Sequence, residues 1–188
     1  MSGGFSMQFA ELERVFSVAH AGSALGDPSL TGVSTDSRAV KVGNLFVALV
    51  GEHFDGHAFV ARAAAGGAAA ALVSRTVADA AIPQIVVADT RLALGRLAQQ
   101  WRRRFKIPVL ALTGSNGKTT VKEMLRSIVM AHLGSPDAVL ATEGNLNNDI
   151  GVPQMMLRLN ANHQTAIFEL GMNHLKEIDY LKIGRAHV

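Results

Sequence analysis

Apolar residues recur along the chain either at helical spacing or in short uninterrupted runs, and the two patterns alternate. Helical spacing predicts helices near the N-terminus, over 57–67, after Asp89 and after Gly117. The uninterrupted runs predict buried strands, at 43–50, 68–74, 83–89, 107–112, 138–142 and 165–170. Alternation of helix and strand favours an α/β protein with parallel sheets.

Three of these helices have a recognisable apolar face, which we expect to be buried. The face of the first is formed by Phe9, Leu12, Val15, Phe16 and Ala19. Asp89 is placed to cap the third, whose face consists of Leu94, Leu97, Ala98, Trp101 and Phe105. The helix after Gly117 presents Val121, Met124, Leu125, Ile128 and Val129. The helix that starts at Asp89 is expected to join two domains, residues 1–88 and 89–181.

Composition and charge exclude several classes of function. The 188 residues carry 18 basic and 15 acidic side chains, a net charge of +3, and the charges are scattered. Even the run "WRRRFK" (101–106) lies on an amphipathic helix, where arginines form a solvated face, so no nucleic-acid partner is expected. The absence of cysteine excludes disulfides, zinc–thiolate sites and thiol catalysis. No export signal or membrane-spanning run is apparent, and we expect a cytoplasmic protein without membrane insertion.

The stretch "LTGSNGKTTVKEML" (112–125) holds the clearest chemical signal. A glycine-rich loop at the end of a strand directs backbone N–H groups at an anion, and the following helix adds the positive end of its dipole. Lys118 would supply charge to the outer phosphates, and Thr119 a hydroxyl for Mg²⁺. The predicted phosphate-binding residues are Gly114, Ser115, Asn116, Gly117, Lys118, Thr119 and Thr120.

The spacing of this loop differs from the usual P-loop pattern. The usual first glycine would fall at Leu112, whereas Gly114 lies only three residues before Gly117. A plain glycine turn that leads into a helix is the alternative. The order of strand, loop, lysine and paired threonines favours a site for ATP or a related nucleotide.

Three further polar stretches are candidates for substrate contact. "VSTDSR" (33–38) offers hydroxyls, a carboxylate and the Arg38 guanidinium to a uracil edge or a diphosphate, although the same string also suits a turn or a helix cap. "GEHFDGHAF" (51–59) offers a ring for stacking, or forms only a solvated turn. The asparagines of "EGNLNNDIGVP" (143–153) either contact substrate or shape their own loop.

Glu169 ends the apolar strand "TAIF" at the edge where ligands of parallel α/β sheets lie. A carboxylate there can reach a Mg²⁺ ion held at the phosphate loop. A surface glutamate without function is the alternative.

Taken together, "TGSNGKTT" with "VKEM", "VSTDSR", the 51–59 turn and "ELGMNH" (169–174) resemble the Mur ligases, ATP-dependent enzymes that form amide bonds. The resemblance implies a small N-terminal α/β domain that binds a UDP-linked substrate and a P-loop-type parallel-sheet domain that binds ATP. It assigns Lys118, Glu169 and His174 to catalysis, and Thr119 and Glu169 to Mg²⁺. It assigns substrate contacts to Ser34, Thr35, Asp36, Ser37, Arg38, Phe54, Asp55, Gly56, His57, Asn145 and Asn148.

The asparagines of 143–153 and "ELGMNH" look most like the family member that adds D-alanyl-D-alanine to a UDP-N-acetylmuramoyl-tripeptide through an acyl phosphate. By this resemblance the whole enzyme is a monomer, and the central domain is truncated here. Residues 182–188 do not resemble the family and back-translate into text like a sequencing-library adapter. We therefore expect a non-native tail and a chain that is inactive by itself.

Two rival functions stay open at the level of sequence. A P-loop kinase or NTPase would turn over ATP without either peptide substrate. A nucleotide-sugar- or ATP-binding module would bind its ligand without any turnover.

Overall fold

A computed structural model describes residues 4–18 and 26–171 of the chain. Its contacts divide the chain into two compact units, Phe5–Leu97 and the residues from Ala98 onward together with Met1–Gly4. The division falls inside helix α3 (Thr90–Arg102). The domain boundary that the sequence suggests, between residues 88 and 89, stays a prediction.

The unit of Phe5–Leu97 is built on a parallel sheet of four strands in the order β3-β4-β7-β8. These strands are β3 (Gly32–Ser34), β4 (Asn44–Val47), β7 (Ala70–Val73) and β8 (Gln84–Val86). Every residue of β4 and β7 is buried, as expected of central strands in a sheet covered on both faces. The predicted apolar runs at 43–50, 68–74 and 83–89 are confirmed as shorter strands.

Helices and two small hairpins complete this unit. The helices are α1 (Phe9–Phe16) and α2 (Val60–Ala65), the latter preceded by a 3₁₀ turn η1 (Gly56–Phe59). The antiparallel pairs are β1 (Met7–Gln8) with β2 (Ser29–Leu30), and β5 (Val50–Gly51) with β6 (Phe54–Asp55). Phe46, Val60 and Ala71 belong to one buried cluster that joins the sheet to α2.

Helix α3 begins as the sequence predicts. The Asp89 carboxylate accepts hydrogen bonds from the backbone N–H groups of Arg91 (2.7 Å) and Leu92 (3.0 Å), which have no partner inside the helix. Its expected apolar face is buried at Leu94, Leu97, Ala98 and Trp101, whereas Phe105 is half-buried.

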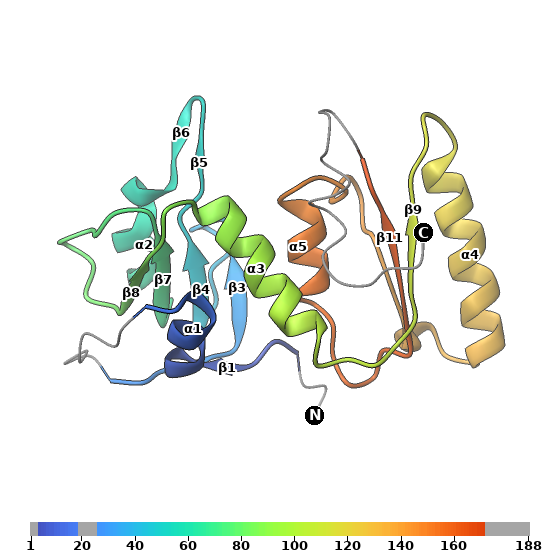
Figure 1. The fold of residues 1–188 in the computed structure, drawn as a ribbon, viewed down its shortest axis with the longest axis horizontal. Helices are drawn as coiled ribbons and strands as arrows, with labels where there is room; N and C mark the ends of the chain where they lie inside the picture. The colour runs from blue at the N-terminus through green and yellow to red at the C-terminus, as the bar shows by residue number, and fades with distance from the viewer. Residues whose placement is uncertain (1–3, 19–25, 172–188) are drawn as a thin grey trace. The chain divides into compact units, whose positions relative to one another are not determined.

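The second unit holds a parallel sheet in the order β10-β11-β9. The strands are β9 (Val109–Leu112), β10 (Val139–Ala141) and β11 (Thr165–Glu169). The helices are α4 (Lys118–Leu133) and α5 (Gly151–Met156), with a 3₁₀ turn η2 (Pro136–Ala138) before β10. In Figure 1 the sheet is seen nearly edge-on, with α4 on one side and α5 on the other. The predicted α/β fold with parallel sheets is confirmed.

The buried face predicted for α4 is wrong in part. Leu125 and Val129 pack on the sheet, but Val121, Met124 and Ile128 are 46%, 61% and 63% exposed. The buried residue of this helix is a lysine, Lys122. Hydrophobic spacing could not foresee this, because the Lys122 ammonium finds its partner, the Thr142 carbonyl, 20 residues away in sequence. None of the helices that the structure describes is both long and apolar enough to span a membrane.

Several elements were not foreseen, and all are short. Strands β1, β2, β5 and β6 have two residues each, so their pairing depends on tertiary contacts rather than on a sequence period. Strand β3 enters the polar string 33–38, and α5 begins within the expected loop 143–153. Helix α5 contains Gly151 and Pro153, and glycine and proline have the lowest helix propensities, so the sequence does not predict a helix there.

Replacement of Asp89 tests the start of α3. Asp89→Ala should lower the free energy of unfolding by about 1 kcal/mol, because two N–H groups of the first turn lose their acceptor. Asp89→Asn keeps an acceptor oxygen and should cost much less. Urea denaturation followed by circular dichroism measures both. Equal losses in the two variants would contradict the capping role.

Candidate functional site

The register of two parallel strands positions the candidate site. Glu169, the last residue of β11, pairs with Leu112, the last residue of β9. The backbone N–H of Leu170 donates to the Leu112 carbonyl at 2.7 Å and extends this pairing by one residue. The carboxylate of Glu169 therefore lies beside the glycine loop that follows β9, as the sequence predicts.

The loop 113–117 turns sharply at two glycines. Gly114 and Gly117 have φ angles of +146° and +76°, and Gly117 stands immediately before the first residue of α4. Residues other than glycine rarely adopt such backbone angles. The Lys118 ammonium folds back over the loop and donates to the Gly114 carbonyl at 2.6 Å. A cation thus lies against an exposed loop at a helix N-terminus, an arrangement suited to binding phosphate.

Thr119 and Glu169 meet across 50 residues of sequence. The Thr119 hydroxyl donates to Glu169 Oε2 at 2.9 Å, and Asn147 Nδ2 donates to Glu169 Oε1 at 3.0 Å. Glu169 is only 3% exposed, and each of its carboxylate oxygens accepts one of these two hydrogen bonds. The two residues that the sequence assigns to Mg²⁺ are therefore in direct contact.

The contacts of three residues around Glu169 were missed by sequence reasoning, which noted Asn147 only as one of the asparagines of 143–153. Asn147 holds the carboxylate, Thr142 accepts the Glu169 backbone N–H through its hydroxyl at 2.9 Å, and Lys122 donates to the Thr142 carbonyl at 2.7 Å. Lys122 and Thr142 are buried polar residues. An unexplained lysine and threonine inside apolar segments are the only sequence signal that would have found them.

The asparagines that were singled out in 143–153 have structural partners. Asn148 Oδ1 accepts the N–H groups of Ile150 (3.2 Å) and Gly151 (2.7 Å) at the start of α5. A Cβ on Gly151 would lie 2.4 Å from the backbone of Leu146, so this close approach requires glycine. Asn145 is exposed and its carbonyl accepts the Asn147 N–H at 2.8 Å. Substrate contacts for Asn145 and Asn148 stay predictions.

The donor set at the loop fits Mg²⁺ bound together with phosphate. Among the described residues there is no group of three or more His, Cys, Asp or Glu side chains that would hold a metal without help. Mg²⁺ usually takes one or two protein oxygens and completes its shell with phosphate and water. The Thr119 hydroxyl and the Glu169 carboxylate, 2.9 Å apart, match that demand. His174 lies outside the described residues.

The string 34–38 forms a compact turn in the other unit. The Asp36 carboxylate accepts from the Arg38 backbone N–H at 2.9 Å and from Nη2 at 2.8 Å, while Ser34 Oγ donates to the Asp36 carbonyl. The Arg38 guanidinium lowers the pKa of Asp36 from its ordinary 3.8 to about 2, with help from that N–H. The Arg38 side chain is nonetheless 79% exposed, so one face of the guanidinium still meets solvent.

The turn 54–57 is held from within. His57 is 3% exposed, its Nδ1 lies 2.6 Å from Asp55 Oδ1, and its Nε2 accepts the Ser74 N–H at 2.8 Å. Arg75 donates to the other oxygen of Asp55, and this contact lowers the pKa of that carboxyl well below its usual range. A Cβ on Gly56 would lie 2.7 Å from the Leu49 carbonyl. These residues shape the turn, whereas their contact with substrate stays a prediction.

Arg62, which the sequence analysis did not single out, connects the segments 33–38 and 51–59. Arg62 donates to Ser37 Oγ through Nε at 3.0 Å, and its guanidinium lies 4.6 Å above the Phe59 ring. That ring stacks on Phe54 at 5.4 Å, and Phe54 is 49% exposed. Ser37, which is buried, and Phe54, which is half-exposed, are therefore linked through Arg62 and Phe59.

The comparisons with known proteins decide the family. A model of the Mur ligase family catalytic domain matches residues 29–102, and a model of the Mur ligase middle domain matches residues 112–187. The chain belongs to the Mur ligase family. These two regions contain both candidate binding surfaces, so the resemblance on which the sequence analysis relied is confirmed.

Individual Mur ligases are similar over most of the chain. UDP-N-acetylmuramoyl-tripeptide–D-alanyl-D-alanine ligase of Escherichia coli is 52% identical over 152 residues, 81% of this chain and 32% of that protein. A crystal structure of MurF from Acinetobacter baumannii has a TM-score of 0.86 at 46% identity, over 96% of this chain and 39% of the other. MurF from Thermotoga maritima in complex with ADP has a TM-score of 0.73 at 29% identity, over 82% and 35%. The chain spans about a third of the length of these relatives.

The Asp36 carboxyl offers a test by titration. Because its pKa is depressed in the folded state, the Asp36–Arg38 contact contributes stability above the ordinary pKa of 3.8 and loses it as the pH falls toward about 2. NMR titration should give a midpoint near pH 2. Arg38→Met should raise that midpoint, and Arg104→Met, the same change elsewhere, should not. An unchanged midpoint in Arg38→Met would contradict the assigned cause.

Proposed function

We propose that the whole protein to which this chain belongs is an ATP-dependent ligase that joins D-alanyl-D-alanine to UDP-N-acetylmuramoyl-tripeptide, a step in peptidoglycan precursor synthesis. Two lines of support converge on it. The relatives that are 52% and 47% identical bear the name of this ligase. The observation that carries the proposal is the contact between Thr119 and Glu169 beside the glycine loop, which unites a hydroxyl and a carboxylate where phosphates would lie. We do not assign the activity to residues 1–188 alone.

The proposed reaction has two steps. A carboxylate oxygen of the tripeptide attacks the γ-phosphorus of ATP, and ADP leaves with the electron pair of the broken P–O bond. The amine of D-alanyl-D-alanine then attacks the carbonyl carbon of the acyl phosphate and loses a proton. Inorganic phosphate leaves with the electrons of the C–O bond, and an amide forms. The products are the lengthened UDP-linked peptide, ADP and phosphate.

The residues of the loop have positioning and electrostatic roles in this proposal. The N–H groups of 114–119 and the Lys118 ammonium would hold the β- and γ-phosphates in line with the attacking carboxylate. Thr119 and Glu169 would bind Mg²⁺, which neutralises phosphate charge when present. Lys118 would exchange its contact with the Gly114 carbonyl for one with phosphate.

The surface around Ser37, Arg38 and Phe54 is proposed to hold the UDP-linked substrate. Arg38 presents a largely exposed guanidinium suited to a diphosphate, and Phe54 presents half of its ring for stacking on a base. We further propose a cytoplasmic monomer that acts on small molecules alone, since ATP and UDP-linked precursors are its substrates. A catalytic role for His174 belongs to the same proposal.

Lys118→Ala in the whole ligase tests the phosphate loop. The loss of a preorganised cation at the transferred phosphate should lower kcat/KM for ligation by about 10²–10³-fold, or about 3–4 kcal/mol. Release of ADP and formation of the lengthened peptide measure it. Lys106→Ala is the control, because it removes an exposed lysine outside the loop. Near-normal ligation by Lys118→Ala would sink the assignment.

Arg38→Ala separates the substrate surface from the nucleotide site. It should raise the KM for the UDP-linked tripeptide about tenfold and leave the KM for ATP within twofold, as expected for one lost charged contact. Steady-state kinetics with each substrate varied in turn provide the comparison. A matching rise in the KM for ATP, or no change in either, would count against the surface described here.

A further inference from the structure

Helix α4 buries a charge where its sequence pattern predicts apolar side chains. In this fully described helix Lys122 is the buried residue, at 3% exposure, whereas its neighbour Val121 is 46% exposed. A lysine is rarely buried unless its ammonium is paired, because the charge loses its hydration. The orientation of α4 places this ammonium inside the protein, so it needs partners there.

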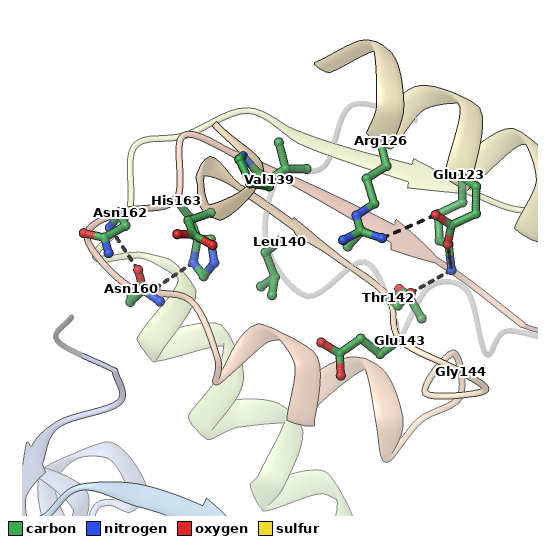
Figure 2. Close-up of a pocket in the computed structure, with 14 residues that line it drawn as sticks. Glu123, Arg126, Val139, Leu140, Thr142, Glu143, Gly144, Asn160, Asn162 and His163 are labelled. Carbon is green, nitrogen blue, oxygen red and sulfur yellow. Dashed lines mark hydrogen bonds and ion pairs between the residues drawn. The ribbon is translucent and has the colours of Figure 1, made fainter. Parts of the chain in front are cut away.

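The ammonium has two partners. Lys122 Nζ donates to the Thr142 carbonyl at 2.7 Å and lies 3.0 Å from Glu123 Oε1, and Arg126 lies 3.5 Å from the other Glu123 oxygen. Figure 2 shows Glu123, Arg126 and Thr142 together at one end of a cleft of about 670 Å³ beside β10. Glu123 lies on the same helix and balances the charge of the ammonium. The hydrogen bond to the Thr142 carbonyl is the contact that links α4 to the end of β10.

Thr142 connects Lys122 to Glu169 through two hydrogen bonds. It is 2% exposed, its N–H donates to the Ile167 carbonyl at 3.0 Å, and its hydroxyl accepts the Glu169 N–H at 2.9 Å. Its carbonyl is held by α4 and its hydroxyl holds the backbone that carries the Glu169 carboxylate. The position of Glu169 therefore depends on the position of Thr142.

The same helix contacts Glu169 a second time. Thr119 and Lys122 are three residues apart, so they lie on one face of α4. Thr119 bonds the Glu169 side chain, and Lys122 bonds the residue that fixes the Glu169 backbone. These contacts close a ring through α4, Thr142 and Glu169 that sets the separation of the two proposed Mg²⁺ ligands.

We propose that Lys122 is a positioning residue for the metal–phosphate site, one that holds Thr119 and Glu169 at the spacing Mg²⁺ needs. The inference rests on the proposed function, since it assumes that these two residues bind Mg²⁺. Contacts behind the ligands of a metal commonly change its affinity by about 10–100-fold. Lys122 would act in this way without touching nucleotide or metal.

The test measures ADP binding to the whole protein by calorimetry at increasing Mg²⁺, so that no turnover is required. Lys122→Met keeps the apolar stem, removes the ammonium, and should raise the Mg²⁺ concentration for half-maximal binding about 10–100-fold. Lys122→Arg retains a charged donor and should recover most of the affinity. Arg126→Met is the control, because it removes a cation from the same helix that pairs with Glu123.

A second pair of variants covers the case in which Lys122→Met does not fold. Thr142→Val removes the hydroxyl that holds the Glu169 N–H and should raise the Mg²⁺ requirement, whereas Thr142→Ser should not. A lower melting temperature with an unchanged Mg²⁺ requirement in the folded variants overturns the positioning role and leaves the proposed function intact. If the unaltered protein binds no ADP at any Mg²⁺ concentration, the proposed function itself fails.

Discussion

The pairing of the ends of β9 and β11 is the constraint on which the candidate site depends. Register sets Leu112 opposite Glu169, so the glycine loop and the carboxylate leave the sheet at the same edge. A shift of one residue would turn the Glu169 side chain to the other face of the sheet, away from Thr119. Backbone hydrogen bonds of the sheet therefore do the first part of the positioning, before any side chain of the site makes a contact.

Side-chain contacts refine what the register provides. Glu169 is buried with both carboxylate oxygens and its N–H partnered, by Thr119, Asn147 and Thr142. A buried polar group is costly when it has no hydrogen-bond partner. Removal of one member of this cluster would therefore leave another member without its partner. Helix α4 supplies two of the links to this cluster, one through Thr119 and one through Lys122.

Much of the fold follows from the sequence, and the reasons for the exceptions are physical. The strands around 107–112 and 165–170, the loop at 113–117 and the cap at Asp89 were predictable, because apolar runs and turn residues act locally. The face that α4 buries was not, since the Lys122 ammonium meets a carbonyl 20 residues away, at Thr142, while Val121, Met124 and Ile128 are exposed. The same holds for the candidate site. Residues within the motifs were found from the sequence. The roles of Asn147, Thr142 and Arg62 were not, because their partners are distant in sequence.

The central claim is that Thr119 and Glu169 together receive the metal that accompanies nucleotide phosphate. A crystal of the protein grown with ADP and Mn²⁺ in place of Mg²⁺ tests it directly, because anomalous scattering locates Mn²⁺ without reference to the protein. The account predicts an anomalous peak about 2 Å from an oxygen of Thr119 or Glu169, next to the phosphates over the loop 113–117. A peak bound away from both residues, with ADP present, would contradict it.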